Sequence, residues 1–360
     1  MKNEYTGHYN SAAQQGLACI TGGKFLDRLE GKSNPADSHF PEDWIASTTL
    51  AVNRGREEFK SEGLSLIEYN GNIVPLKKIM ETFPFEVLGE EHFKKYGPNT
   101  QFLFKFLDSA IRLHIQAHPA ISFSQKYLNS SSGKTEAYVI LGTRDEVENP
   151  YIYLGFQHSI GRKDFKIAIE NQDIEKILSC FEKIPVKPGD VFIVPGGLPH
   201  AIGEGVFMLE IMEPADFVVR LEFERGGYVL PEQARFMGRN IDFAMDMIDF
   251  RSISVEEIKN KYFCLPVISD EQGGGSESIL IDKRYTNCFS VHKVNVQSSF
   301  QKKADTFYAG VVTGGSGCII SGTNNRDVKS GDKFLIPYNA GKIEYISNYA
   351  MEIILAFPPK

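Results

Sequence analysis

Apolar residues change their spacing several times along the chain, and each spacing predicts a type of element. Within residues 74–108, 164–183 and 233–250 they recur at intervals of three and four, which predicts helices. From residue 184 to about 230, and again after residue 276, short apolar runs alternate with Gly and Pro, which is typical of strands in a barrel or sandwich. The helical spacing is clearest at Leu76, Ile79, Met80 and Phe83.

Residues 111–118 alternate strictly between apolar and polar side chains. A period of two predicts a strand with two different faces, because successive side chains point to opposite sides. Positions i and i+2 share a face, so Gln116 and His118 could reach one ion together. The predicted faces are Ile111, Leu113, Ile115 and Ala117 on one side, and Arg112, His114, Gln116 and His118 on the other.

One ten-residue segment occurs twice. Residues 186–195 reappear as residues 328–337, with Val, Lys, Gly, Asp, Phe and Pro in the same places. We interpret the two segments as copies of one β-module. Beyond the repeat the copies differ, because His200 in the first corresponds to Lys342 in the second.

The first copy carries a specific motif. The spacing of Gly189, Pro195, Gly197 and His200 resembles the second sequence motif of the cupin barrel, in which two turns deliver a His into the barrel. Upstream, Gln116-x-His118 stands in place of the His-x-His of the first cupin motif.

Glu136 opens a strand between these two motifs, so Gln116, His118, Glu136 and His200 are the expected metal ligands. Two imidazoles, a carboxylate and an amide oxygen suit one zinc ion, while iron and manganese stay open on ligand type.

These patterns predict a mainly β fold of two cupin, jelly-roll-like barrels with inserted or peripheral helices. We expect an N-terminal arm at 1–60 packed on the first barrel, and a catalytic barrel with helical insertions at 61–230. A helical connector at 231–270 and a second, metal-free barrel at 271–360 would follow, with Glu271–Ser276 as a linker. His292 stands alone in the second barrel, so a structural role is expected for it.

Composition narrows the function classes. The chain has 360 residues and a net charge of −7, which favours neither nucleic acid nor anionic membrane as a partner. A small anionic substrate would therefore need a local basic pocket. The sequence contains no apolar run of membrane-spanning length and no signal-peptide core near Met1. The five dispersed cysteines are typical of free thiols, so we expect a cytoplasmic protein. We also expect a monomer or a homodimer.

Several segments together resemble the type I mannose-6-phosphate isomerases, from about Glu42 to Phe250 and more weakly beyond. They are Glu42-x-Trp44-x-x-Ser47, Phe104–Asp108, Ile115–Pro119, Gly133–Glu136, Pro199–Gly203, Arg220 and Asn240–Phe250. The resemblance implies zinc dependence and interconversion of mannose 6-phosphate with fructose 6-phosphate.

For that enediol chemistry we expect three catalytic residues. Glu210, on a strand among methionines, would be the base that moves the proton. Arg220 would stabilise an oxyanion or hold phosphate, and Lys134 would anchor the substrate. The expected substrate-binding residues are Lys105, His114 and Trp44.

The chain also departs from the family pattern. His114 stands where the family commonly has a small hydroxyl residue, Ala120-Ile121 replace acidic residues, and Ile20–Gly23 replace a Trp-Gly-Gly segment. These changes spare the metal ligands but leave the exact sugar phosphate open. Two alternatives therefore stand beside the isomerase: a metal-dependent cupin oxygenase and a sugar-binding cupin without catalysis.

Overall fold

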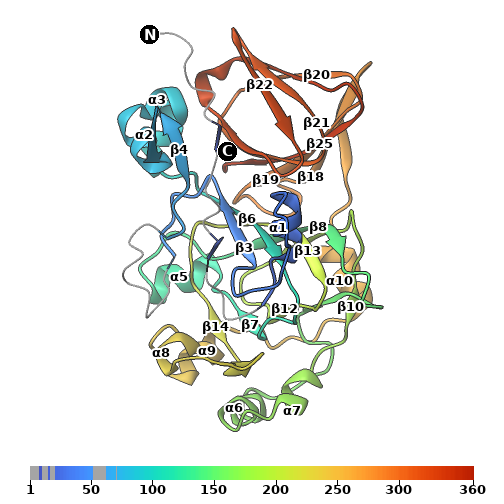
Figure 1. The fold of residues 1–360 in the computed structure, drawn as a ribbon. Helices are drawn as coiled ribbons and strands as arrows, with labels where there is room; N and C mark the ends of the chain where they lie inside the picture. The colour runs from blue at the N-terminus through green and yellow to red at the C-terminus, as the bar shows by residue number, and fades with distance from the viewer. Residues whose placement is uncertain (1–7, 10–14, 17–20, 52–61, 70) are drawn as a thin grey trace.

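The structure is a computed structural model, and it describes the chain except for residues 1–7, 10–14, 17–20, 52–61 and 70. The described residues form two β bodies, one above the other in Figure 1, with helices at their periphery. The mainly β class and the cupin architecture expected from the sequence are confirmed.

Two facing sheets make the first body. The six-stranded sheet has the order β11 (Val191–Val194), β8 (Glu136–Thr143), β13 (Val206–Met212), β6 (Leu103–Asp108), β3 (Glu42–Ile45) and β2 (Gln15–Gly16). The five-stranded sheet has the order β10 (Ile184–Pro185), β9 (Tyr151–Leu154), β12 (His200–Ile202), β7 (Gln116–Ala117) and β14 (Val219–Arg220).

The second body is one ten-stranded sheet that curls on itself. Its long strand β21 (Tyr308–Ser321) pairs at one end with β23 and β25 and at the other with β22 and β24. The other strands are β1 (His8–Tyr9), β17 (Val267–Gln272), β18 (Gly275–Ile281), β19 (Ser290–Val296), β20 (Ser299–Lys303), β22 (Asn324–Lys329), β23 (Lys333–Ile336), β24 (Lys342–Ile346) and β25 (Met351–Phe357).

Short helices surround the sheets. They are α1 (Lys24–Leu29), α2 (Leu76–Thr82), α3 (Pro84–Val87), α4 (Glu90–Tyr96), α5 (Ile121–Tyr127), α6 (Arg162–Glu170), α7 (Ile174–Leu178), α8 (Glu232–Arg235), α9 (Ile241–Met247) and α10 (Val255–Tyr262). The helix predicted at 164–183 is split in two where Gln172 takes a left-handed conformation, with φ 50°. None of the described helices is long and apolar enough to cross a bilayer.

Two sequence predictions need correction. Glu271–Ser276 is no linker, because it ends β17, turns at Gly273-Gly274 and begins β18 in a continuous hairpin. The strand predicted at 111–118 is regular only at Gln116–Ala117, although Leu113 N–H still donates to Ile202 O. The predicted boundary at residue 60 lies outside the described residues, and the other boundaries stay predictions.

The internal repeat is confirmed in three dimensions. Gly189 and Gly331 both have a positive φ, 93° and 94°. Asp190 accepts a hydrogen bond from Lys187 N–H, and Asp332 accepts the equivalent bond from Lys329 N–H, both at 2.9 Å. The two turns therefore have the same geometry because the same Gly-Asp pair builds both.

One apolar core joins the two bodies. The outer face of the six-stranded sheet contributes Phe104, Phe106, Val139, Leu209 and Ile211, and the second body contributes Val291, Val311, Leu335, Ile354 and Ala356. The second barrel therefore covers one face of the sheet, while the opposite face points into the first barrel.

A buried ion pair crosses this apolar interface. Lys333 of β23 pairs with Asp43 of β3, and both side chains are nearly inaccessible. In the first copy of the repeat the position of Lys333 holds Val191, so the charge is specific to the second barrel.

We expect Asp43→Ala to lower the free energy of unfolding by about 3–5 kcal/mol, because it removes the buried carboxylate that pairs with the Lys333 ammonium. Urea unfolding would measure this loss. The exposed pair Lys94–Glu90 serves as a control, and Glu90→Ala should leave the free energy of unfolding close to that of the native chain. Equal losses in both variants would contradict the interpretation.

Candidate metal centre and active site

Three neighbouring strands of the five-stranded sheet align one row of polar residues. His200 of β12 lies directly opposite Gln116 of β7, and Gln116 lies opposite Arg220 of β14. Residues opposite each other in antiparallel strands share a face, so the three side chains point into the barrel together.

The facing sheet supplies a second polar set. In β8, β13 and β6, Tyr138, Glu210 and Lys105 lie in one row. Glu136 lies two residues before Tyr138, so it shares their face. Trp44 of β3 pairs with Lys105 and extends the row toward the edge.

His118, Glu136 and His200 converge between the two sheets. His118 Nε2 lies 2.9 Å from Glu136 Oε1, and His200 Nε2 lies 3.4 Å from Glu136 Oε2. All three side chains are buried, and their candidate ligand atoms lie within 4.8 Å of one another. Among the residues that the structure describes, no other group of His, Cys, Asp and Glu meets this spacing.

The second ring nitrogen of each His shows which atom carries the proton. His118 Nδ1 lies 2.7 Å from Phe217 O, and His200 Nδ1 lies 2.8 Å from Leu198 O. A carbonyl oxygen only accepts, so both Nδ1 atoms must donate. In a neutral ring the lone pair is then on Nε2, aimed at Glu136.

This arrangement fits a cation. His118 Nε2 and Glu136 Oε1 are buried and neither makes a hydrogen bond, despite their short separation. Burial lowers the pKa of His118 to about 3, so its ring is neutral at physiological pH. Burial alone would raise the pKa of Glu136, but the positively charged Lys134 beside it is among the groups that hold the pKa well below its usual value. A carboxylate and two lone pairs therefore face one small volume, which suits a divalent ion such as zinc.

Gln116 is placed to be the fourth ligand. Its Nε2 lies 3.4 Å from His200 Nε2. Rotating the amide by half a turn would aim its oxygen at the same space, and a cation would favour that orientation. Its role as a ligand stays a prediction.

Tyr138 orients the carboxylate of Glu136. Its hydroxyl donates a hydrogen bond of 2.9 Å to Glu136 Oε2. Groups that orient metal ligands in this way tune affinity, as do the carbonyls that fix the two imidazoles. Tyr138 was not among the predicted site residues, although its position two residues after Glu136 placed it on the same strand face.

On the same sheet face as Glu136 lies a chain of charges. Lys105 Nζ lies 2.9 Å from Glu42 Oε1 and 3.0 Å from Glu210 Oε2. Burial raises the pKa of Glu210 to about 8, against the attraction of Lys105. Burial alone would lower the pKa of Lys105, but Glu210 and Glu42 raise it, so the lysine keeps its proton.

Trp44 belongs to the same group, because its Nε1 donates to Glu42 Oε2 at 3.0 Å. Lys134 reaches the metal ligands instead, with its Nζ 3.5 Å from Glu136 Oε1. The structure thus brings Lys105, Glu210 and Trp44 together on one side and Lys134 beside Glu136.

Arg220 and His114 lie in a third, more basic region. Arg220 Nη1 donates to Ala234 O at 3.2 Å. His114 is buried, and burial with the nearby Arg220 lowers its pKa to about 4. Next to them, Glu222 binds both Nη atoms of Arg112 at 2.6 Å, which the sequence did not indicate.

The second barrel has different residues at these places. In the first barrel, Glu136 pairs with Val194. Ile336 occupies the position of Val194 in the second copy of the repeat, and it pairs with Tyr308. Tyr308 therefore corresponds to Glu136. The Tyr308 hydroxyl bonds to that of Tyr345 at 2.9 Å, both fully buried.

The structural role expected for His292 stays a prediction, and the structure places a carboxylate beside its ring. Its Nδ1 lies 2.6 Å from Glu277 Oε1, and Lys302 binds the same carboxylate. The positive charge of Lys302 therefore balances the negative charge of Glu277 within the second barrel.

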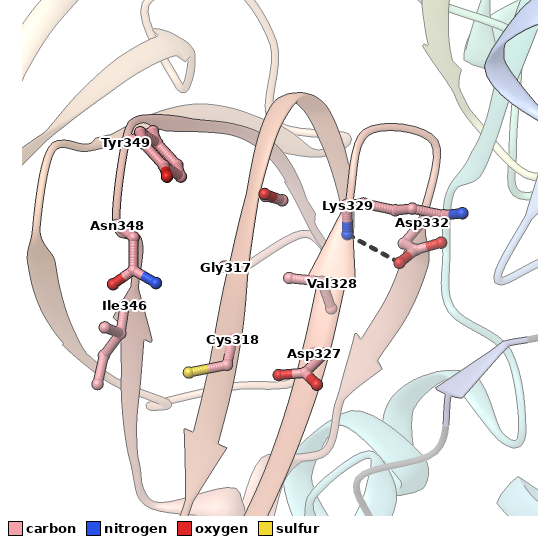
Figure 2. A pocket seen from close by; sticks show the side chains of 10 residues that line it. Gly317, Cys318, Asp327, Val328, Lys329, Asp332, Ile346, Asn348 and Tyr349 are labelled. Atoms are coloured by element: carbon pink, nitrogen blue, oxygen red, sulfur yellow. Dashed lines mark hydrogen bonds between the residues drawn. The ribbon is translucent and has the colours of Figure 1, made fainter.

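A pocket of about 600 Å³ lies on the second barrel, away from the metal ligands (Figure 2). It lies on β21, β22 and the segment after β24, and Asp332 in its wall accepts the repeat's hydrogen bond from Lys329 N–H. Its lining is Ser316, Gly317, Cys318, Asp327, Val328, Lys329, Asp332, Ile346, Asn348 and Tyr349. We assign the chemistry to the buried cluster of the first barrel, because only there do metal-ligand atoms converge in the described chain.

We expect His200→Ala to abolish metal retention, because it removes one of the two imidazole ligands. Lys342→Ala is the matched control in the second barrel and should leave one metal per chain. Elemental analysis after dialysis measures both variants. Equal metal loss in both would place the site elsewhere.

Tyr138→Phe tests the support of Glu136. Loss of its hydrogen bond should weaken zinc affinity by roughly 10–100-fold while the fold is kept, as is typical of groups behind a metal ligand. Competition with a chromophoric chelator measures this, and an unchanged affinity would show that the hydroxyl has no such role.

Comparisons with known proteins are consistent with this site. No family model matches the chain. It is 28% identical over 262 residues to the probable mannose-6-phosphate isomerase GmuF of Bacillus subtilis, covering 71% of this chain and 74% of the relative. It is also 28% identical over 295 residues to mannose-6-phosphate isomerase ManA of the same organism, covering 79% and 85%.

Solved structures agree in fold. The mannose 6-phosphate isomerase of Bacillus subtilis superposes with a TM-score of 0.74 at 19% identity, covering 98% of this chain and 99% of that one. The Salmonella typhimurium enzyme bound to fructose 6-phosphate and zinc gives 0.70 at 16% identity, covering 99% and 100%. The chain is therefore similar in sequence and in fold to the mannose-6-phosphate isomerases.

Proposed function

We propose that the protein is a zinc-dependent isomerase that interconverts mannose 6-phosphate and fructose 6-phosphate. The observation that carries the proposal is the buried His118–Glu136–His200 cluster, with two imidazole lone pairs aimed at a charged carboxylate. The curated relatives carry this activity in their names, which favours it over the oxygenase and the non-catalytic alternatives.

Residues Gln116, His118, Glu136 and His200 would hold the zinc. When bound, zinc supplies a Lewis acid that polarises the substrate's carbonyl and hydroxyl oxygens and stabilises negative charge on them. Lys134, with its Nζ 3.5 Å from Glu136 Oε1, is placed to donate to the same oxygens.

Glu210 is our proposed base. The reaction moves one proton between C1 and C2 of the sugar, and a group with a pKa near neutrality can both accept and return it. Glu210 lies two strand positions from the level of Glu136, roughly 6–7 Å along the barrel. A sugar carbon chain bound between them would contact the metal and the base together.

The remaining predicted residues would bind the substrate. Arg220 shares the row of Gln116 and His200, so its guanidinium can neutralise an oxyanion or the phosphate. His114 lies two residues before Gln116 and would contact the substrate beyond the metal. Lys105 and Trp44 would act at the Glu210 end. A cytoplasmic location and a monomeric or homodimeric state complete the proposal.

The direct test is turnover. Zinc-loaded protein incubated with mannose 6-phosphate should form fructose 6-phosphate, followed by a coupled assay. Arg220→Ala should lower kcat/KM by roughly 10²–10³-fold, as loss of a group that stabilises developing charge commonly does. No turnover with zinc, manganese, cobalt or iron would refute the function.

A pH profile tests the base. A base must be deprotonated to accept a proton, so kcat/KM should fall as the pH is lowered through the pKa of Glu210. That pKa should be about 8 or lower, because a bound cation nearby lowers it. In Glu210→Gln this fall at low pH should disappear, and kcat/KM should be lower by roughly 10²–10⁴-fold. Glu224→Gln, on the exposed strand β15 (Glu224–Arg225), is the control. If kcat/KM of Glu210→Gln still fell in the same way as the pH was lowered, another group would be the base.

A further inference from the structure

Glu213, directly after β13, is a buried carboxylate with an unusual set of partners. Its Oε2 accepts a hydrogen bond from Gly133 N–H at 2.9 Å, and its Oε1 accepts one from Thr135 N–H at 3.0 Å. Its own N–H donates to Thr135 O at 3.1 Å. Both carboxylate oxygens therefore bind the main chain on either side of Lys134.

The same segment is held from its other side. Lys134 N–H donates to Pro119 O at 2.9 Å. A Cβ placed on Gly133 would lie 2.7 Å from both Pro119 O and Ile121 N, too close for any side chain. Gly133 thus packs closely against the chain that follows His118, and Lys134 is hydrogen-bonded to it.

One residue of the second barrel also contacts the Glu213 carboxylate. Cys288, in the loop before β19, lies against Glu213. Burial, together with that carboxylate, raises the pKa of the Cys288 thiol to about 11. The thiol therefore stays protonated and able to donate to Glu213.

We propose that Glu213 is a positioning residue, which fixes the main chain at Gly133–Thr135 and thereby sets the Lys134 ammonium beside Glu136. Hydrogen bonds to a buried carboxylate are stronger than neutral ones, and leaving either partner unpaired is costly. Catalysis is sensitive to such placement, since a shift of about 1 Å can cost roughly 10²-fold in rate. The proposal rests on the proposed isomerase function.

Hydrogen exchange tests the contact without using the reaction. In Glu213→Gln the amide offers only one acceptor oxygen, so Gly133 and Thr135 N–H should exchange faster, measured by mass spectrometry on peptides spanning residues 129–137. Glu277→Gln, which removes a buried carboxylate in the second barrel, should leave these peptides unchanged. Unchanged exchange in Glu213→Gln would overturn the proposal.

A double-mutant cycle tests how the residue acts. Glu213→Gln should lower kcat about 10–100-fold in the native chain, with zinc still at one per chain. In a Lys134→Ala background the same change should lower kcat less than about twofold, because Lys134 is the group that Glu213 positions. An equal loss in both backgrounds would overturn positioning through Lys134.

Gly133→Ala provides an independent perturbation if Glu213→Gln fails to fold. It displaces the same segment by steric contact and should be equally non-additive with Lys134→Ala. If the effects of Gly133→Ala and Lys134→Ala on kcat were additive, the proposal would also be overturned. If the native chain showed no isomerase turnover while exchange at Gly133 and Thr135 still rose in Glu213→Gln, the proposed function would fail and the contact would stand.

Discussion

A charged carboxylate that faces two imidazole lone pairs inside a closed barrel is the constraint on which the rest of the structure depends. Without a cation, Glu136 and the Nε2 atoms of His118 and His200 would repel one another. The carbonyls of Phe217 and Leu198 fix the rings in this orientation, and the Tyr138 hydroxyl holds the carboxylate. The surrounding groups thus favour a metal-binding arrangement that is costly without metal.

The two barrels are copies of one β-module, and the cluster of His118, Glu136 and His200 lies in the first copy. Both copies keep the Gly-Asp turn, because it shapes the backbone. In the second copy Tyr308 replaces Glu136, and the interior becomes an apolar core. That barrel packs on the outer face of the catalytic sheet, tied by Asp43 and Lys333, and it reaches Glu213 through Cys288. It therefore packs against the first barrel, and none of the predicted metal ligands lies in it.

Much of the site could be predicted because its residues have local signatures. The Gly189–His200 spacing and the i, i+2 pair Gln116 and His118 are short-range patterns, and the structure confirms that His118, Glu136 and His200 converge. The failures had a common cause. Glu271–Ser276 has the composition of a linker, yet cross-strand pairing makes it a hairpin. Residues 111–118 alternate like a strand, yet side chains replace some of the expected strand pairing, since Glu222 accepts from Ile115 N–H and Arg225 donates to Arg112 O.

The sequence by itself determined the strand and helix periodicity, the duplicated module and the ligand types, because each depends on neighbouring residues along the chain. Only the tertiary structure decided which charges pair. Lys105 joins Glu42 and Glu210 across three strands, His292 joins Glu277, and Glu213 binds the main chain beside Lys134. Such contacts depend on register and burial between distant segments, and burial then raises the pKa of Glu210 to about 8.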